Sequence, residues 1–338
     1  MKNFKKILSA FVIITLMATV LAGCTSESKN PKDEAGNGKS ITLRMSQASA
    51  ADGAIGLSME KFAELIHEKT DGRYTVETFH NGQLGSERDN IEAVQMDNLD
   101  IAVVNQAPLS NFVPEIGAVD LPYVITSYEH ADNVFLGEIG DGFLEQLADH
   151  KIQGLTIWES GFRNLTNSKK EVNSVEDVKG LRIRVMENKI HQDLWRSLGA
   201  DPVAMAWGDA YTALQQGAID GQENPATVID KNNVGEVNKN MAITEHVYST
   251  VFIIMSPKTW NSLTPEDQDI FKEAALEAGL YERELSRKMD QEAISNLEGI
   301  GVKVTYPDKQ GFIDATEKVR EDYGKEFSEL LKKIEEQK

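Results

Sequence analysis

Two arginines and an amide stand at points where strands are expected to end. Residues 181–185, Leu-Arg-Ile-Arg-Val, alternate apolar and charged side chains as a half-buried strand does, and Arg184 is its last outward residue. Arg163 follows a second expected strand. Asn224 follows a third and precedes a proline, which favours extended backbone. A guanidinium can hold a carboxylate through two parallel hydrogen bonds, so this set is suited to binding an organic acid.

Each of these residues also has an ordinary structural explanation. Arg163 would make a surface ion pair, Arg184 would lie on the solvated side of an edge strand, and Asn224 would be a turn residue or helix cap. Arg182 shares a face with Arg184, but it lies near the start of the strand. Because α/β clefts open at the carboxyl ends of strands, we predict Arg182 to be a solvated surface charge and Arg184 to be functional.

The first half of the chain alternates strand and helix signals, which predicts a parallel sheet with helices on its faces. Strand-like segments lie at 41–45, 73–79, 100–105 and 155–158, and helical spacing occurs at 55–66, 91–95 and 135–147. The glycines at 137–142 match no nucleotide-binding spacing, and we predict a surface turn there.

Residues 162–248 form a second, smaller α/β unit in this interpretation. Its strands are expected at 181–185, 201–205 and 219–220, and its helices at 189–198 and 209–216. Tyr248–Met255 is strongly β-prone and is predicted to return to the first sheet. The helical pattern from Thr264 to about Leu297 exceeds a typical globular helix, so we expect it to lie across both lobes. A short strand at 302–305 and a helix from about 309 to the end complete the chain.

These elements predict two lobes. The first comprises 41–161 with 249–288, and the second comprises 162–248 with 289–338. About 300 residues are enough for two domains of ordinary size, each with its own core.

The N-terminal residues are typical of an export signal. Lys2, Lys5 and Lys6 precede an apolar run at 7–21 that is too short for a comfortable membrane span, so 1–23 is predicted to be a signal peptide. Leu21-Ala-Gly-Cys24 resembles a bacterial lipobox, which implies cleavage before Cys24 and its lipidation. An ordinary signal peptide is the alternative. Residues 24–40 are then expected to be a lipidated cysteine and a flexible tether.

Charge and cysteine content exclude several classes of protein. Removing the three signal lysines leaves 32 basic against 54 acidic residues, a formal charge of −22, which disfavours nucleic acid and anionic lipid as partners. Cys24 is the only cysteine, so no disulfide can form within the chain. An anionic ligand would have to be bound by local positive charge, which points again to individual arginines.

A search for catalytic residues finds no constellation. The histidines show no HxxxH or HxxH spacing, and there is no GxSxG elbow or free cysteine nucleophile. We therefore predict a protein that is not an enzyme and that has no metal site and no cofactor.

An ordered set of motifs identifies a resemblance. Segments 161–167 (GFRNLTN), 180–184 (GLRIR), 198–202 (LGADP), 211–216 (YTALQQ) and 220–225 (DGQENP) resemble the solute-binding proteins of tripartite ATP-independent periplasmic (TRAP) transporters, the DctP-type family. The likeness includes 81–85 (NGQLG) and 121–123 (LPY). It implies a periplasmic-binding-protein-like α/β fold of two lobes, joined by crossing segments and a long helix, that closes around a ligand.

The resemblance also implies roles. Arg184 would clamp a substrate carboxylate, with Arg163 and Asn224 beside it. The protein would deliver its ligand to an ion-gradient-driven TRAP permease, and we expect a monomer attached to the membrane only by its lipid. Further residues predicted to line the site are Glu87, Asn105, Trp158, Met186, Met205 and Trp207.

The predicted ligand is a hydroxylated monocarboxylate, with hexuronates first. Glu87 would accept hydrogen bonds from hydroxyls at the far end, although a solvated helix N-terminus explains it equally well. The alternatives are a C4-dicarboxylate or 2-oxoacid ligand, a ligand-sensing lipoprotein for a membrane receptor kinase, and a surface lipoprotein enzyme.

Overall fold

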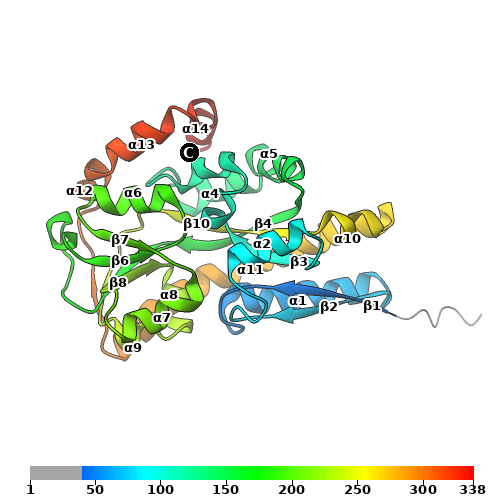
Figure 1. Cartoon of the computed structure of the whole chain (residues 1–338), viewed down its shortest axis with the longest axis horizontal. Helices are drawn as coiled ribbons and strands as arrows, with labels where there is room; N and C mark the ends of the chain where they lie inside the picture. The colour runs from blue at the N-terminus through cyan, green and yellow to red at the C-terminus, as the bar shows by residue number, and fades with distance from the viewer. Residues whose placement is uncertain (1–39) are drawn as a thin grey trace, which may run out of the picture. The chain divides into compact units, whose positions relative to one another are not determined.

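The computed structural model describes residues 40–338. The expected signal peptide, Cys24 and most of the tether lie outside these residues. The described chain forms two mixed sheets, each covered by helices, as Figure 1 shows. No helix within this range combines the length and apolar character needed to cross a bilayer.

The first sheet has the strand order β2-β1-β3-β10-β4. Its strands are β1 (Ile41–Ser46), β2 (Tyr74–Phe79), β3 (Ile101–Asn105), β4 (Gln153–Phe162) and β10 (Tyr248–Met255). Strand β1 pairs in parallel with β2 and β3, but β10 is antiparallel to both β3 and β4. The predicted return of 248–255 to this sheet is confirmed. The four strands from the first half of the chain run in one direction, as expected, but β10 enters from the other lobe and makes the sheet mixed.

The second sheet has the order β11-β9-β5-β8-β6-β7. Its strands are β5 (Asn164–Asn167), β6 (Arg182–Val185), β7 (Asp201–Ala204), β8 (Gly221–Asn224), β9 (Asn240–Ala242) and β11 (Lys303–Thr305). Strand β6 is parallel to β7 and β8, and β5 is antiparallel to β8 and β9. The short strand expected at 219–220 begins instead at Gly221.

The helices follow the strands in chain order. Around the first sheet they are α1 (Ala54–Lys69), α2 (Glu87–Gln95), α3 (Gln106–Leu109), η1 (Pro114–Asp120), α4 (Tyr128–Phe135), α5 (Glu138–Gln146), η2 (Leu147–His150) and α10 (Pro257–Ser262). Around the second they are η3 (Val175–Val178), α6 (Lys189–Ser197), α7 (Trp207–Gln215), α8 (Ala226–Lys231) and α9 (Val234–Val237). The predicted surface turn at 137–142 is wrong, since Gly140 and Gly142 lie within α5.

Two segments carry the chain directly from one sheet to the other. Strand β4 passes into β5 at Arg163, and β9 continues through residues 243–247 into β10. The Arg163 backbone N–H donates to the Val247 carbonyl at 2.9 Å, so the two crossing segments are joined by a backbone hydrogen bond.

A single helix spans both lobes. Helix α11 (Pro265–Gly299) packs on α1 and β4 of the first lobe and on α8 of the second (Figure 1), which confirms the long helix expected from the sequence. It begins at Thr264, whose hydroxyl accepts from the Asp267 backbone N–H at 3.2 Å, and Pro265 occupies the first helical position.

The C-terminal segment is three helices rather than one. Helices α12 (Lys309–Ala315), α13 (Glu317–Gly324) and α14 (Ser328–Glu335) run along one side of the molecule, shown in red in Figure 1. Ile334 of α14 belongs to the first lobe's core, and the Ile334 carbonyl contacts His130 of α4 at 2.8 Å. The end of the chain therefore packs on the first lobe. Our division into lobes, which assigns 289–338 to the second lobe, stays a prediction.

Each sheet is buried on both faces. In β3, Ala102 and Val104 face one apolar cluster while Ile101 and Val103 face another. This explains why β3 is a continuous apolar run, because a strand covered on both sides has no solvent face. The second sheet likewise lies between two clusters, which contain Leu165, Ile183 and Trp195 on one side and Ile219, Ile229 and Met241 on the other.

Candidate functional site

A pocket lies between the two lobes at the carboxyl ends of several strands. It encloses about 360 Å³ of empty space, part of it open to solvent. The first lobe contributes Ala48, Ser49, Ile55, Glu87, Asn105 and Ser160, and the second contributes Arg184, Met186, Trp207, Asn224 and Val228. Six of the nine residues predicted to bind substrate therefore line one pocket, which they reach from opposite sides.

Arg184 is a buried cation whose side chain forms no ion pair within residues 40–338. Its Nε and Nη2 donate to the Met205 carbonyl at 2.9 and 2.8 Å, and its guanidinium carbon lies 5.3 Å from the centre of the Trp207 ring. Burial lowers the pKa of Arg184 to about 10, which leaves it charged at neutral pH. Because Met205 occupies the Nε side, the Nη1 and Nη2 edge remains for a bidentate acceptor.

Arg163 is equally buried but is already paired. Its Nε lies 2.5 Å from Glu223 Oε2, and its Nη2 donates to Glu223 Oε1 at 3.0 Å and to the Glu223 carbonyl. His246 Nε2 contacts the same carboxylate at 2.9 Å. Burial opposes ionisation of Glu223, but the Arg163 charge and the His246 hydrogen bond hold its pKa well below the usual range. Arg163 thus lies at the crossing between the lobes rather than on the pocket wall.

Glu87 and Asn105 form a hydrogen-bonded pair on the first-lobe side. Glu87 Oε1 accepts from the Asn105 backbone N–H at 2.7 Å and from Asn105 Nδ2 at 2.8 Å. Glu87 is the first residue of α2, whose N-cap Ser86 forms a capping box with Asp89. The cap fixes the helix start, and Asn105 fixes the carboxylate, so the pair holds one acidic oxygen at the pocket.

The second-lobe wall is set by strand and helix ends. Asn224 ends β8, where its Nδ2 donates to Gln222 Oε1 at 2.6 Å. Trp207 begins α7, and its Nε1 contacts Asn232 Oδ1 at 3.4 Å. Met186 directly follows β6. The same strand, β6, therefore places Arg184 and then Met186 at the pocket.

Two further residues predicted to bind substrate, Trp158 and Met205, do not line this pocket, and Met205 contributes only its backbone carbonyl. Trp158 belongs to the core between the first sheet and α11, where its Nε1 donates to the Ala275 carbonyl at 2.9 Å. The structure therefore does not bring Trp158 to the pocket. The Met205 side chain packs in a core cluster of the second lobe, and only its carbonyl is used by Arg184. Arg182 is not simply solvated: its Nη2 lies 2.8 Å from Asp220 Oδ1.

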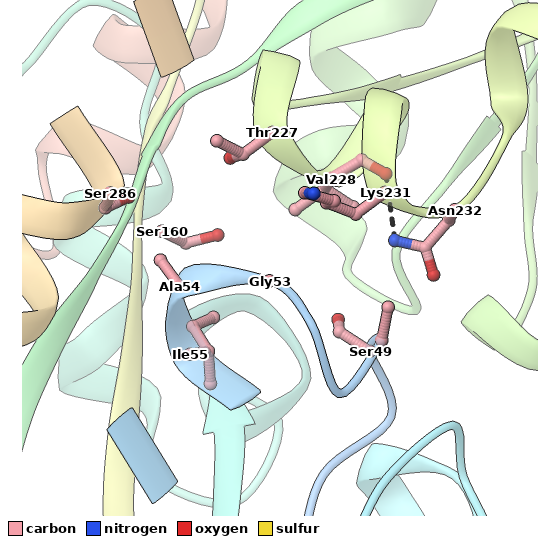
Figure 2. Close-up of a pocket in the computed structure, with 11 residues that line it drawn as sticks. Ser49, Gly53, Ala54, Ile55, Ser160, Thr227, Val228, Lys231, Asn232 and Ser286 are labelled. Carbon is pink, nitrogen blue, oxygen red and sulfur yellow. Dashed lines mark hydrogen bonds between the residues drawn. The ribbon is translucent and has the colours of Figure 1, made fainter. Parts of the chain in front are cut away.

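A second, mostly apolar pocket continues from the first. It shares Ser49, Ile55, Ser160 and Val228 with that pocket and extends to Lys231 on α8. Figure 2 shows α8 facing the segment between β1 and α1 across this opening. Lys231 Nζ lies 3.5 Å from Asp52 Oδ2, so an ion pair connects the lobes at its edge.

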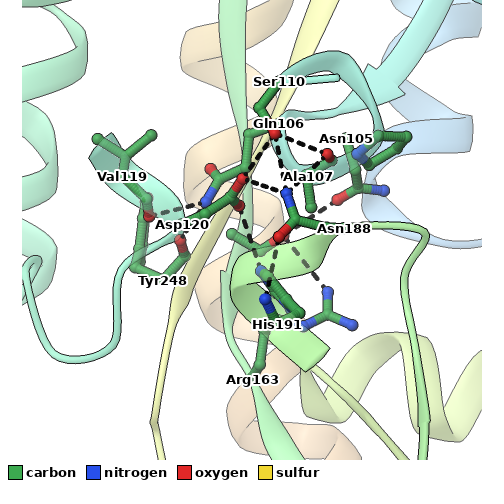
Figure 3. A network of polar contacts seen from close by, with 12 residues as sticks. Asn105, Gln106, Ala107, Ser110, Val119, Asp120, Arg163, Asn188, His191 and Tyr248 are labelled. Carbon is green, nitrogen blue, oxygen red and sulfur yellow. Dashed lines mark hydrogen bonds and ion pairs between the residues drawn. The ribbon is translucent and has the colours of Figure 1, made fainter. Parts of the chain in front are cut away.

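A polar network joins the lobes at the segment that follows β6 (Figure 3). Asn188 caps α6 by accepting from the His191 backbone N–H at 3.0 Å, while its Nδ2 donates to Ser110 Oγ at 2.8 Å and to Asp120 Oδ2 at 2.9 Å. His191 Nε2 contacts Asp120 Oδ1 at 3.2 Å. The contacts with Ser110 at the end of α3 and with Asp120 of η1 run from the second lobe to the first, so they fix the segment that follows Arg184.

Sequence reasoning missed several residues of this region. Ser49, Ile55 and Val228 line the pocket without any distinctive motif, although Ser49 follows β1 at the carboxyl edge where ligands are expected. Glu223 stands inside the quoted DGQENP segment, but its partner Arg163 is 60 residues away, and no local pattern reports such a pairing. Within the described residues, no cluster of three or more histidine, cysteine or acidic side chains could hold a metal.

A pocket between two α/β lobes, lined by a buried cation that forms no ion pair within the described residues, is typical of a solute-binding protein. The family described as bacterial extracellular solute-binding protein, family 7 (DctP), matches residues 45–326. The chain belongs to this family, whose members are binding proteins rather than enzymes and act outside the cytoplasm with the membrane subunits of TRAP transporters.

Similar proteins support this assignment over nearly the full described length. A solute-binding protein of Verminephrobacter eiseniae is 34% identical over 287 residues, 85% of this chain and 86% of its own. The TRAP solute-binding protein of Polaromonas sp. JS666, solved with D-erythronate, has a TM-score of 0.85 and 35% identity, covering 87% of this chain and 97% of its own. That of Pseudomonas putida F1, solved with D-glucuronate, has a TM-score of 0.85 and 30% identity, with the same coverage. The fold and the family predicted from the sequence are confirmed.

Proposed function

We propose that this protein captures a hydroxylated monocarboxylate, a sugar acid such as a hexuronate, between its lobes and delivers it to a TRAP permease. The observation that carries the proposal is the difference between two buried arginines: Glu223 neutralises Arg163, whereas Arg184 reaches the pocket with its charge unmatched. A carboxylate bound at Arg184 supplies the missing counter-charge. An uncharged ligand would leave the guanidinium buried and unpaired, which is costly.

Arg163 acts in this proposal as a positioning residue. Its Nη1 contacts Ser249 Oγ at 3.4 Å, and Ser249 Oγ in turn donates to Asn105 Oδ1 at 3.0 Å. The buried ion pair thus reaches Asn105, and through it Glu87, by a continuous chain of hydrogen bonds. Asn224 lies on the pocket wall and is available to the ligand carboxylate beside Arg184.

The character of the opposite wall supports a hydroxylated ligand. Glu87 offers an acceptor, and Ser49 and Ser160 can donate or accept. Trp207 and Met186 offer apolar surface for a carbon skeleton. Two relatives of known structure hold a four-carbon and a six-carbon hydroxy acid, D-erythronate and D-glucuronate, which share this combination of one carboxylate and several hydroxyls.

The attachment and assembly form a further part of the proposal. We infer that signal cleavage leaves Cys24 as a lipidated N-terminus, that the segment up to residue 40 tethers the folded body to the membrane, and that the protein is a monomer held only by this lipid. Replacement of Cys24 by serine should release the protein from membranes and abolish incorporation of a radiolabelled fatty acid. Incorporation that persists in Cys24→Ser would contradict lipidation at this residue.

The decisive experiment is a thermal-shift panel with uronates, aldonates, C4-dicarboxylates, 2-oxoacids and ectoine, followed by calorimetry of each positive ligand. A uronate or aldonate is expected to raise the melting temperature, and the stabilisation should grow with the logarithm of the free ligand concentration above its Kd. A response confined to dicarboxylates or 2-oxoacids would replace the ligand but keep the clamp. No response to any acid would contradict the function. Neighbouring genes for a receptor kinase without a permease would favour the sensing alternative.

A further inference from the structure

Glu87 stands on the opposite wall of the pocket from Arg184, and its charge is also unmatched. Within residues 40–338 no lysine or arginine nitrogen lies within 4.0 Å of its carboxylate, and Arg88, its neighbour in sequence, points to Glu92 at 3.9 Å. The two Asn105 donors both use Oε1. Oε2 makes no hydrogen bond to the described protein, so it is the oxygen left for a ligand.

The pocket is therefore dipolar. Its second-lobe wall carries the Arg184 guanidinium, its first-lobe wall carries the Glu87 carboxylate, and Arg163 is neutralised by Glu223. A ligand whose carboxylate binds Arg184 must direct its other end toward the Glu87 wall. An acidic oxygen at that wall accepts from hydroxyl groups and repels a second carboxylate.

We propose that Glu87 determines specificity by excluding diacids: it accepts hydrogen bonds from the neutral far end of a hydroxylated acid and repels a carboxylate there. This inference rests on the proposed function, because it requires that one carboxylate of the ligand occupies Arg184. It separates sugar acids with one carboxylate from C4-dicarboxylates and aldarates, which the Arg184 clamp alone would accept equally.

Local hydrogen bonds hold the Glu87 carboxylate in the position from which it would repel a second anion. The Asn105 backbone N–H cannot move without disturbing the end of β3, and the Ser86 capping box fixes the first turn of α2. Glu87 therefore cannot swing away from a second anion without losing both Asn105 hydrogen bonds. A like-charge contact held in this way contributes to specificity at small cost to the preferred ligand.

The test uses ligand pairs that differ only at the far end. D-Galactonate and galactarate share six open-chain carbons but end in a hydroxymethyl group or a carboxylate, and D-erythronate and meso-tartrate are the four-carbon equivalents. Calorimetry on the whole protein gives the ratio of diacid to monoacid Kd for each pair. For the wild type we expect a ratio of at least about 30 with the pair that fits.

Three variants test whether the charge or the shape of the Glu87 side chain determines the ratio of the two Kd values. Glu87→Gln keeps the size, and its amide oxygen can still accept from Asn105 while its Nε2 faces the ligand, so the ratio should fall at least about tenfold. Glu87→Asp keeps the charge and should weaken the monoacid while preserving discrimination. Glu92→Gln removes the same charge from the exposed face of α2 and should leave the ratio unchanged.

The outcomes are distinguishable. A wild type that prefers the diacid, or a Glu87→Gln variant with an unchanged ratio, overturns this inference while leaving Arg184 as the clamp. If the wild type binds neither member of either pair and no uronate, the proposed function fails first, and the inference fails with it. Equal loss of the ratio in Glu92→Gln would assign the discrimination to the overall acidity of the lobe and overturn the role of Glu87.

Discussion

Arg163 and Glu223 form an ion pair with both side chains almost completely buried, 1% and 0% exposed, at the point where the chain passes between the sheets. Arg184, on the neighbouring strand β6, is just as buried, but within residues 40–338 its guanidinium contacts only a backbone carbonyl and an aromatic ring. The contrast separates a cation that stabilises the fold from one that is available to a ligand.

Replacing Arg184 by alanine should abolish binding without weakening the fold. Losing a buried charge-assisted contact to a carboxylate should raise the ligand Kd at least about 100-fold. The ligand-free melting temperature should stay the same or rise, since a desolvated cation without an anionic partner is removed. Calorimetry and thermal unfolding measure the two effects. Arg182→Ala, on the same strand, is the matched control: it should keep the Kd and lose the Asp220 ion pair. Retained affinity in Arg184→Ala would move the clamp elsewhere.

Glu223→Gln, in contrast to Arg184→Ala, should weaken the fold. Arg163 would then be a buried charge with no anion, and the free energy of unfolding should fall by about 3 kcal/mol. Urea unfolding of the ligand-free protein checks this value. The double variant Arg163→Met, Glu223→Leu should recover part of the loss, because it removes both charges. A Glu223→Gln variant within 1 kcal/mol of the wild type would show that the pair is screened by solvent.

Asp290 makes stability dependent on pH. Burial raises its pKa to about 6, although hydrogen bonds from the Thr227 and Ala226 backbones at the start of α8 lower it. The folded protein therefore holds this proton more tightly than the unfolded chain, whose value is near 3.8. The stabilisation is complete below about pH 4 and is lost as pH rises through 6.

Asp290→Asn should remove the loss of stability at higher pH, while keeping an oxygen for the Thr227 N–H. Between pH 4 and 7 the variant should gain on the order of 1 to 2 kcal/mol relative to the wild type. Urea unfolding at several pH values gives the difference. Parallel curves for the two proteins would mean that Asp290 does not titrate in this range. Glu159 and Glu245, which also raise its pKa, are unchanged in the variant.

The ion pair between Lys231 and Asp52 should matter little, despite its place across the pocket. Its side chains are 31% and 70% exposed, and pairs of this kind contribute at most about 1 kcal/mol. Lys231→Met should therefore raise the dissociation rate less than about fivefold, and the effect should disappear in 1 M salt. Stopped-flow displacement measures the rate. A salt-independent change of 50-fold or more would show that Lys231 touches the ligand.

The sequence best predicts which residues line the pocket when their place in the pocket follows from their place along a strand. Asn224 and Asn105 each end a strand and Arg184 is the last residue but one of β6, and the carboxyl ends of these strands meet at the pocket. Trp158 could not be placed in this way. Every residue of β4 after Gln153 is buried, so alternation does not tell which face of the strand meets the pocket and which meets α11.

Pairings between distant segments were beyond local patterns. Nothing near Arg163 indicates Glu223, and nothing within 248–255 indicates that β10 runs antiparallel to its neighbours. The direction of β10 is fixed by the crossing from the other lobe, which is a property of the whole topology. The break of the C-terminal helix at Thr316 and near Phe327 likewise follows from packing on both lobes.

The position of β10 also governs when the protein can fold. It lies between β3 and β4, so the first sheet has a gap until Met255 is available, although all its other strands lie within the first half of the chain. The N-terminal half alone would present two unpaired strand edges and cannot close its core. The first sheet can therefore be completed only after β10 has been synthesised, so most of the chain is present before the first lobe closes.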